Sequence, residues 1–399
     1  MISYDEAYQL TMESISPLEI ETVELVQAVN RVPGKDLYSR VWSPTCDVSL
    51  KDGYAVLSDD VKNAAPDRPV VLKLVGSIAA GGDWAGEVGP GQTVRILSGA
   101  PVPPGAQAVL AEEFAEAKDN SVRVFNNADP GRNILLRGND VKEGQKIIQA
   151  GKLLNPPIVG YLASAGFNEV PVIRNPKVAI IATGDEVIAP GKKLEDGKLY
   201  ASNLVTLAAW CTRYGFTVET RIVIDREKLI RETLEEALEN NDAVITSGGA
   251  WKGERDLVVR VLETLNWVKK YHYVRMGPGK AIGFGMVERK PVFCLPGGPP
   301  SNHIAFLQLA LPGVLKLAGR KHPELPKTTV ELAETIRGKI DWTQFVHGYL
   351  MPGEGIIKYA PAALKSRLQM MATSEAIVKI PEGTDCIPVG SYISAYLLN

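Results

Sequence analysis

The sequence predicts a multidomain protein: an elongated helical region, a β-rich domain, a parallel-sheet α/β domain and a small C-terminal β domain. Three observations predict this architecture. From Lys177, strands rich in Val and Ile alternate with amphipathic helices, which is typical of a parallel sheet. Between Val41 and Ile134, short apolar runs alternate with Pro and Gly, and from Pro326 apolar residues recur at every second position. The length of 399 residues favours more than one domain.

The N-terminal segment is predicted to be helical. Ser3 and Glu6 have the spacing of a capping box, so a helix should begin at Tyr4. A second short helix is predicted over residues 21–30. After Pro156 the stretch PIVGYLASAGFNEV again has the apolar spacing of a helix. The β-rich stretch is therefore expected as an insertion between two halves of a helical region.

Composition excludes several classes of protein. The net charge of −2, with no basic tail, argues against nucleic-acid binding. The four cysteines lie far apart without a CxxC pair, so neither a zinc ribbon nor a disulfide framework is expected. They are expected to be free thiols in a reducing cytoplasm. No apolar run approaches the length of a membrane span, and the N-terminus lacks the apolar core of a signal peptide.

The α/β region contains four predicted strands that alternate with four predicted helices. The strands are VAIIAT, FTVETRIVI, DAVITSGG and PVFCLPGG, and the helices are SNLVTLAAWCTRYG, REKLIRETLEEALEN, DLVVRVLETL and SNHIAFLQLALPGVLKLAG. Ser202 or Asn203 is the expected cap of the first helix, and Gly215 its stop. In the second, Leu229 and Leu234 are expected on the buried side.

Three strand ends in this region carry unusual loops, at residues 183–186, 247–256 and 295–302. Because ligands bind at the carboxyl ends of parallel strands, these loops should share one functional edge. Their glycines allow a ligand to approach backbone N–H groups, which can bind an anion. Each of these loops, taken alone, is more simply interpreted as a turn that ends a strand. Three such loops on one predicted edge favour a functional cleft.

Charged residues near this edge indicate an anionic ligand and a cation. Lys252, Arg255, Arg275 and Lys280 would attract an anion. The carboxylates would repel one unless a hard cation such as Mg²⁺ joined them to phosphate oxygens; they belong to Asp185, Glu186, Asp225 and Asp256. The four histidines lack metal-ligand spacing, and His303 is expected to be structural. The sequence has neither a Walker A motif nor a dinucleotide fingerprint.

Together these motifs resemble the molybdopterin molybdenumtransferase family, MoeA, which is shared with the E domain of gephyrin. The resemblance covers nearly the whole chain and rests on a specific combination of stretches: SPTCDVSLKDGYAV, VRILSGAPVPPGAQAVLAEE, GRNILLRGNDVKEGQ, TGDEV, GKLYASN, ITSGGAWKGERD, GPGKAIGFG and LPGGPPSN.

The resemblance implies four domains. Residues 1–40 and 135–172 would form helical, dimerising domain I, and residues 41–134 the β-rich domain II. Residues 173–323 would form the molybdopterin-binding α/β domain III, and residues 324–399 a β-barrel domain IV. It also implies a homodimer whose cleft lies between domain III of one subunit and domain II of the other.

The implied reaction inserts molybdate or tungstate into adenylylated molybdopterin, with Mg²⁺-dependent hydrolysis and release of AMP. A molybdopterin adenylyltransferase is an expected partner. The residues implied in catalysis are Asp52, Asp140, Glu186, Asp225 and Asp256, with Glu186, Asp225 and Asp256 on the metal. Those implied in molybdopterin binding are Thr183, Gly184, Asp185, Ser247, Gly248, Gly249, Lys280, Pro296, Gly297 and Ser301.

Departures from the family pattern leave a second class of function open. Gly277 stands where a lysine is usual and Trp251 where a serine is usual, while Lys51 replaces a methionine. Lys51, Lys252 or Arg275 would have to compensate for the missing lysine. The alternative is therefore a carrier that binds molybdopterin with little catalysis. A third hypothesis is a scaffold that binds another protein through its C-terminal domain, but no feature of the C-terminal sequence indicates such a binding surface.

Overall fold

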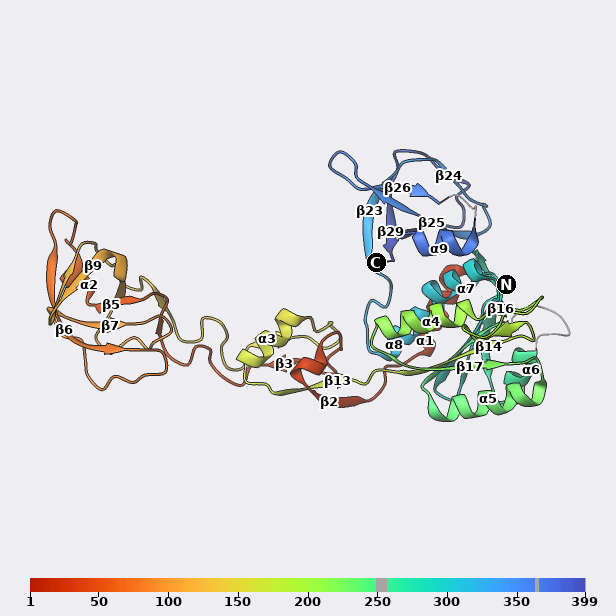
Figure 1. Cartoon of the computed structure of the whole chain (residues 1–399), viewed down its shortest axis with the longest axis horizontal. Coiled ribbons are helices and arrows are strands. Elements are labelled where there is room, and N and C mark those ends of the chain that lie inside the picture. The colour runs from red at the N-terminus through yellow and green to blue at the C-terminus, as the bar shows by residue number, and fades with distance from the viewer. Residues whose placement is uncertain (249–256, 363–365, 399) are drawn as a thin grey trace.

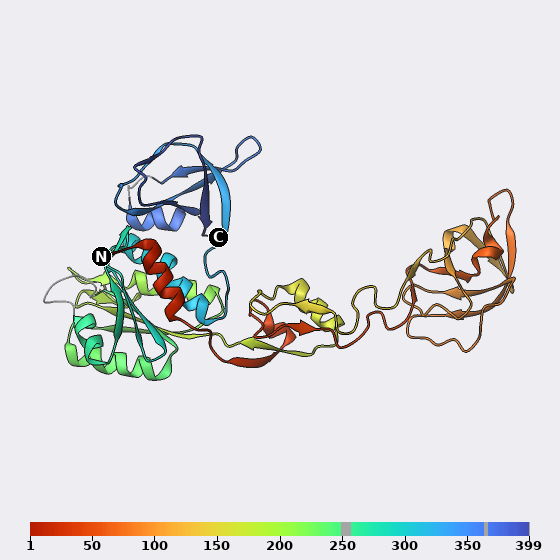
Figure 2. The same cartoon turned by 180° about the vertical axis from the view of Figure 1, so that it is seen from behind.

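The computed structural model describes residues 1–248, 257–362 and 366–398. These residues form an elongated molecule (Figure 1). A β-rich body lies at one end, a narrow neck follows, and a larger α/β body with a small barrel lies at the other end. The view from behind shows the same arrangement (Figure 2). The chain leaves the α/β body after its first helix and returns only after the neck and β-rich body are complete.

The α/β body is built on a six-stranded sheet in the order β17-β14-β18-β22-β21-β19. The four strands predicted from the sequence are parallel, whereas β21 and β19 add an antiparallel edge. The bounds are β14 (Lys177–Thr183), β17 (Thr217–Val223), β18 (Ala243–Ser247), β19 (Val268–His272), β21 (Gly283–Val287) and β22 (Lys290–Leu295).

Helices cover both faces of this sheet because β14 is apolar on both sides. Ile180 belongs to one core and Ile181 to the other. One face is covered by α4 (Ser202–Arg213), α7 (Pro299–Ala305), the π-helical η3 (Phe306–Ala310) and α8 (Leu311–Leu317). The other is covered by α5 (Glu227–Asn240) and α6 (Leu257–Thr264). In α5 the buried face contains Ile230 and Leu234, while Leu229 is exposed, contrary to expectation.

The first helix, α1 (Tyr4–Ser14), has the expected capping box, with Ser3 and Glu6 bonded reciprocally. Its buried residues Tyr4 and Ala7 join the core of the α/β body. The short β1 (Ile2–Ser3) pairs with β20 (Val274–Gly277) of the same body. The first residues of the expected helical domain therefore pack on the α/β sheet, because their apolar face is buried there.

The neck is mostly β-ribbon rather than helical, which corrects the expected character of domain I. The predicted helix over 21–30 is wrong: β2 (Ile20–Glu24) pairs antiparallel with β13 (Glu169–Ile173), and only the short 3-10 helix η1 (Leu25–Ala28) follows. The remaining elements are β3 (Leu37–Tyr38), β12 (Lys146–Ile148) and α3 (Pro156–Ser164). Side chains along β2 alternate between exposed and half-buried, as expected for a strand, in which successive side chains point to opposite faces.

The β-rich body carries a six-stranded sheet in the order β8-β5-β7-β6-β10-β9. Its elements are β5 (Gly53–Val56), α2 (Ser58–Val61), β6 (Val70–Ile78), β7 (Gln92–Ile96), β8 (Ala108–Ala111), η2 (Glu112–Phe114), β9 (Ala115–Lys118) and β10 (Ser121–Val124). At its base, β4 (Val48–Ser49) pairs with β11 (Ile134–Leu135).

The C-terminal region contains a closed small barrel, in which each strand pairs with two neighbours around the ring β25-β26-β23-β29-β27. The strands are β23 (Lys327–Leu332), β25 (Thr343–Met351), β26 (Lys358–Pro361), β27 (Ala376–Ile380) and β29 (Tyr392–Leu397). A side ribbon of β24 (Ile336–Arg337) and β28 (Cys386–Ile387) and the helix α9 (Arg367–Thr373) complete it. Because β20 also pairs with β25, the barrel is attached to the α/β body by main-chain hydrogen bonds.

Candidate functional site

A pocket lies where β14, β18 and β22 end side by side. Chain order reverses across β14, since β17 lies on one side of it and β18 on the other, and such a switch point opens a crevice at the carboxyl ends. The cavity measures about 600 Å³, within the range of small-molecule sites. Its walls include Thr183, Glu186, Lys198, Tyr200, Asn203, Ser247, Gly248, Gly297, Pro299, Ser366 and Arg367.

Glycine is required at the junction of the strand ends. Gly248 has φ +102°, and a Cβ there would lie 2.5 Å from the carbonyl oxygen of Thr183. A Cβ on Gly297 would in turn lie 3.9 Å from the Cα of Gly248. The three loops therefore approach one another at backbone distance, which leaves their peptide groups at the pocket wall.

Two asparagines hold the strand ends together. The Asn203 side-chain amide donates to the carbonyl oxygen of Gly297 at 2.8 Å and to Ser247 Oγ at 3.4 Å. The amide of Asn302 donates to the same Ser247 Oγ at 3.0 Å and to the Pro296 carbonyl oxygen at 3.0 Å. The cap expected at Ser202 or Asn203 is wrong, because α4 follows Ala201, and Asn203 lies inside the helix with its amide turned to the pocket.

The acidic residues of TGDE have different surroundings. Glu186 lines the pocket, and its carboxylate folds back over Gly184, since a Cβ at Gly184 would be 2.7 Å from Glu186 Oε2. Asp185 Oδ1 instead accepts the backbone N–H of Asp225 at 3.1 Å. Lys198 Nζ donates to the Asp185 carbonyl oxygen at 2.8 Å. Positive and negative groups thus meet at one rim of the pocket.

Thr183 presents a hydroxyl without a partner. The residue is 4% exposed, and within the described parts of the chain its Oγ1 is buried with no hydrogen-bond partner. Buried hydroxyls are normally satisfied, so this atom on the pocket wall is suited to a ligand or an ordered water.

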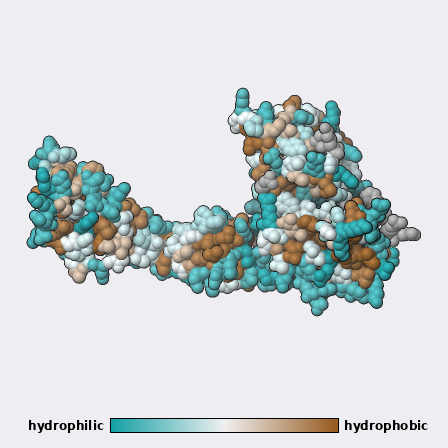
Figure 3. Space-filling view, viewed as in Figure 1, coloured by the Kyte–Doolittle hydropathy of each residue, from teal (hydrophilic) through white to brown (hydrophobic). Residues whose placement is uncertain are grey.

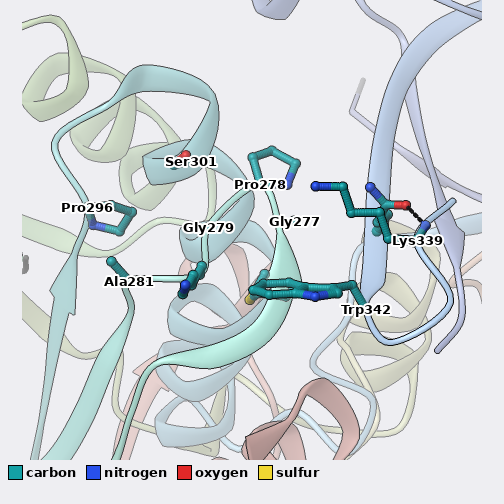
Figure 4. Close-up of a pocket in the computed structure, with 11 residues that line it drawn as sticks. Gly277, Pro278, Gly279, Ala281, Pro296, Ser301, Lys339 and Trp342 are labelled. Carbon is teal, nitrogen blue, oxygen red and sulfur yellow. Dashed lines mark hydrogen bonds between the residues drawn. The ribbon is translucent and has the colours of Figure 1, made fainter. Parts of the chain in front are cut away.

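The remaining molybdopterin-binding candidates lie in a neighbouring, smaller pocket. Lys280, Pro296 and Ser301 line a cavity of about 280 Å³ between the loop after β20 and the barrel (Figure 4). Pro296 and Gly297 are consecutive, so the loop after β22 separates the two cavities.

Two predicted acids lie far from both pockets. Asp52 is in the β-rich body, where its Oδ1 accepts the Ser98 N–H at 2.7 Å. Asp140 lies at the junction with the neck, and its carbonyl oxygen accepts the Tyr161 hydroxyl at 3.2 Å. The β-rich body and the α/β sheet are at opposite ends of the molecule, so neither acid reaches the pockets of its own chain (Figures 1 and 2).

The predicted residues Gly249 and Asp256 lie outside the described residues. Among the described residues, no cluster of three metal-ligating side chains occurs. Glu186 is nevertheless suited to Mg²⁺, which proteins commonly hold with one or two carboxylates together with substrate phosphates. In the described ranges no helix is long and apolar enough to cross a membrane.

Comparison with known proteins identifies the family. Residues 2–166 match the family described as "MoeA N-terminal region (domain I and II)", and residues 179–316 match "Probable molybdopterin binding domain". Molybdopterin molybdenumtransferase 2 of Mycobacterium tuberculosis is 30% identical over 403 residues, covering 99% of each chain. The chain belongs to the molybdopterin molybdenumtransferase family. Molybdopterin molybdenumtransferase of Haemophilus influenzae is 31% identical over 350 residues, and the match covers 86% of this chain and 85% of the relative.

A solved structure supports the assignment. The molybdopterin biosynthesis MoeA protein of Pyrococcus horikoshii superposes with a TM-score of 0.84 at 27% identity, covering 100% of both chains. The resemblance inferred from sequence motifs is therefore confirmed, as are a MoeA-like fold and the C-terminal barrel. Relatives that carry the family name are transferases.

Several site residues escaped sequence reasoning. Lys198 belongs to the GKLYASN motif but carried no assigned role, although it lines the larger pocket. Lys339 and Trp342 line the smaller pocket from the barrel, and no local signal marks them. His303, for which a structural role was expected, is buried. Its Nε2 accepts the Trp210 indole N–H at 3.1 Å, and its Nδ1 lies 3.3 Å from Nε2 of His347.

Proposed function

We propose that this protein inserts molybdate or tungstate into adenylylated molybdopterin, with hydrolysis of the phosphoanhydride and release of AMP. The observation that carries the proposal is the pocket at the ends of β14, β18 and β22, which is lined by Glu186, Lys198 and Thr183. Among the described residues the Thr183 hydroxyl finds no hydrogen-bond partner. An adenylylated pterin needs anion-binding groups for its pyrophosphate and a carboxylate near the bond that breaks. We place the reaction in the cytoplasm, with an adenylyltransferase supplying the nucleotide.

The residues have separable roles in this proposal. Backbone N–H groups of the loop at Gly297 bind the phosphates, because those of Gly184 and Gly248 already donate to the carbonyl oxygens of Val223 and Leu295. Lys198 balances the phosphate charge. Glu186 positions the water that attacks the phosphoanhydride. Mg²⁺, held by Glu186 with Asp225 and Asp256, would supply neutralisation of the pyrophosphate charge. Asp185 keeps the loop after β14 against the loop after β17.

We further propose a homodimer in which Asp52 and Asp140 complete the site of the partner. The separation of these acids from the pockets of their own chain supports this arrangement. Apolar residues also gather on the neck around η1 and α3 (Figure 3), where Val26 is 82% exposed. An exposed apolar patch on a slender segment is suited to burial against a second copy.

The test is AMP release from adenylylated molybdopterin with Mg²⁺, with molybdate and tungstate added separately. Glu186→Gln should lower the rate about a hundredfold or more while nucleotide binding stays within a few-fold. Glu195→Gln is the matched control, because Glu195 is an exposed acid of the neighbouring loop that does not line the pocket. It should leave the rate unchanged.

The alternative function is a carrier that binds molybdopterin without turnover. It is favoured by Gly277, which leaves the smaller pocket without a side chain at that position. Tight nucleotide binding with no AMP release by the unaltered protein would establish the carrier and exclude the transferase. Release that depends on one oxyanion would identify the physiological metal.

A further inference from the structure

Three side chains form a hydrogen-bonded series between the α/β body and the barrel. The Trp210 indole N–H of α4 donates to Nε2 of His303 on α7, and His303 Nδ1 lies 3.3 Å from Nε2 of His347 on the barrel strand β25. Both histidines are buried. The elements α4, α7 and β25 are therefore connected to one another through these rings.

The indole decides the direction of the hydrogen bonds. An indole N–H can only donate, so Nε2 of His303 is the acceptor. Burial lowers the pKa of His303 to about 3, so at pH 7 the ring is neutral and carries its proton on Nδ1, from which it donates to His347. Directional bonds of this kind fix one relative geometry, whereas apolar packing in the same place would tolerate sliding.

The two helices in this series also hold the strand ends at the larger pocket. On α4, Trp210 lies about two helical turns after Asn203 and hence on the same face of the helix. The Asn203 amide bonds Ser247 Oγ and the loop after β22. On α7, Asn302 precedes His303 and bonds Ser247 Oγ as well. The histidine pair is thus joined to the helices that position one wall of the pocket.

The barrel end of the series leads to another wall of the same pocket. The His347 carbonyl oxygen accepts the Ala362 N–H at 2.8 Å, and α9 packs on both β25 and α7 (Figure 1). Ser366 caps α9 by accepting the Gln369 N–H, and Ser366 and Arg367 line the larger pocket. The position of β25 over α7 therefore sets where α9 presents these two residues.

Other contacts attach the barrel at different places. Met276 and Gly277 of β20 pair with β25 beside the smaller pocket. Phe345 of β25 packs edge-to-face on Tyr4 of α1, with 5.1 Å between the ring centroids. His347, two residues further along the strand, brings β25 to α7. Without its bond to His303 the barrel would stay attached, but its orientation over α7 would be less restricted.

We propose that His303 and His347 are positioning residues of the larger pocket, because their hydrogen bond fixes α9 against the strand-end loops and keeps Ser366 and Arg367 at the bound nucleotide. This inference rests on the proposed function for the identity of the ligand. Glu186 belongs to the loop after β14, whereas the series reaches the ends of β18 and β22. Loss of the bond should therefore weaken nucleotide binding and leave the chemical step nearly unchanged.

The first experiment compares two substitutions of His347 in the full-length protein by hydrogen exchange and mass spectrometry. His347→Leu keeps an apolar side chain of similar size but removes the acceptor, whereas His347→Gln places an amide oxygen near the position of Nε2. Exchange of the α9 amides should become about tenfold faster in His347→Leu, the change expected for one buried hydrogen bond, and should stay near the unaltered rate in His347→Gln. Trp210→Phe removes the donor at the other end of the series and should change α9 exchange in the same direction. Unchanged α9 exchange in His347→Leu and Trp210→Phe would overturn the proposal.

Nucleotide binding is the second measurement. The dissociation constant for adenylylated molybdopterin should rise about tenfold in His347→Leu, and His347→Gln should retain most of the affinity. Tyr359→Phe is the matched control, because it removes a hydrogen bond to the Val346 carbonyl oxygen from a side chain in the barrel core. It should lower stability without weakening nucleotide binding. Equal weakening by Tyr359→Phe and His347→Leu would assign the effect to barrel stability and reject the proposal.

AMP release separates this inference from the proposed function. In His347→Leu the KM for the nucleotide should rise with its dissociation constant, while kcat should stay within about twofold. Weaker nucleotide binding by His347→Leu in a protein that releases no AMP would retain this inference and reject the transferase. AMP release with an unchanged KM in His347→Leu would do the reverse.

Discussion

The carboxylate of Asp185 accepts a hydrogen bond from the backbone N–H of Asp225, with 3.1 Å between Asp185 Oδ1 and Asp225 N. This bond joins the loops after two neighbouring parallel strands, β14 and β17. Glu186, the next residue, is left to line the pocket. The two acids of TGDE therefore have different surroundings: Asp185 holds the loop, and Glu186 faces the pocket.

Asp185 substitutions should separate these tasks. Asp185→Asn keeps an acceptor oxygen and should leave the free energy of unfolding nearly unchanged, whereas Asp185→Ala should lower it by about 1 kcal/mol. Urea unfolding measures both. AMP release should fall less for Asp185→Asn than for Glu186→Gln. An equal loss of activity in both variants would show that Asp185 also contacts the reacting groups.

Gly248→Ala should disrupt the pocket. The new Cβ would meet the Thr183 carbonyl oxygen at 2.5 Å, and φ +102° is strained for alanine in any case. We expect a loss of roughly 2 kcal/mol or more in unfolding free energy and weaker nucleotide binding. Gly191→Ala is the control, because Gly191 has φ +87° with nothing within 4 Å of a built Cβ. The Gly191→Ala variant therefore measures backbone strain without a steric clash. Equal effects of the two variants would contradict the close approach of Gly248 to the Thr183 carbonyl oxygen.

The α/β domain was predictable because its signals are local. Apolar periodicity identified the parallel strands, and the glycine-bearing loops at Thr183, Ser247 and Pro296 fell on one edge as expected. The neck was not predictable in the same way. The local pattern of residues 21–30 predicted a helix, but β2 is a strand because it pairs with β13, whose residues follow far later in the sequence. Long-range pairing overrides local propensity there.

The candidate site was predictable only in part, for the same reason. The predicted strand-end residues Thr183, Ser247 and Gly297 line the larger pocket. Lys339 and Trp342 reach the smaller pocket through the attachment of the barrel, which no motif encodes. The separation of Asp52 from the pockets likewise depends on the length of the neck. The roles assigned to these acids remain predictions until the dimer is tested.

The junction between neck and α/β body should depend on Arg174. Its guanidinium bonds Asp242 through two contacts, at 2.7 and 2.8 Å, and also contacts Glu19. Burial tends to raise the pKa of Asp242, but hydrogen bonds from Arg174 and the Lys177 N–H hold it below its ordinary value. The contribution of this pair to stability is therefore present at neutral pH and is lost as pH falls below about 4.

Arg174→Lys should lower the free energy of unfolding by roughly 2 kcal/mol, because an ammonium group cannot make the paired contacts. Arg221→Lys is the control, since its pair with Glu219 is more exposed and should change stability by less than about 1 kcal/mol. Chemical unfolding at pH 7 measures the difference. Similar losses in the two variants would contradict a special role for Arg174 at the junction.

The buried pair of His303 and His347 should make stability depend on pH. Burial, with the neighbouring His347, lowers the pKa of His303 to about 3, and burial lowers that of His347 to about 4. Both are neutral in the folded chain at pH 7. Below an unfolded value of 6.5 the unfolded chain binds protons that the folded chain does not, so stability present above pH 6.5 is lost as pH falls toward 4.

The expected slope is up to about 1.4 kcal/mol per pH unit for each histidine. Urea unfolding between pH 7 and pH 4 measures it. A His303→Gln, His347→Gln double variant should be less stable at pH 7 but should lose this part of the slope, while His322→Gln, at an exposed histidine, should keep it. Because the pair joins α7 to β25, its protonation should also loosen the barrel from the α/β body. An unchanged slope in the double variant would assign the pH dependence to other groups.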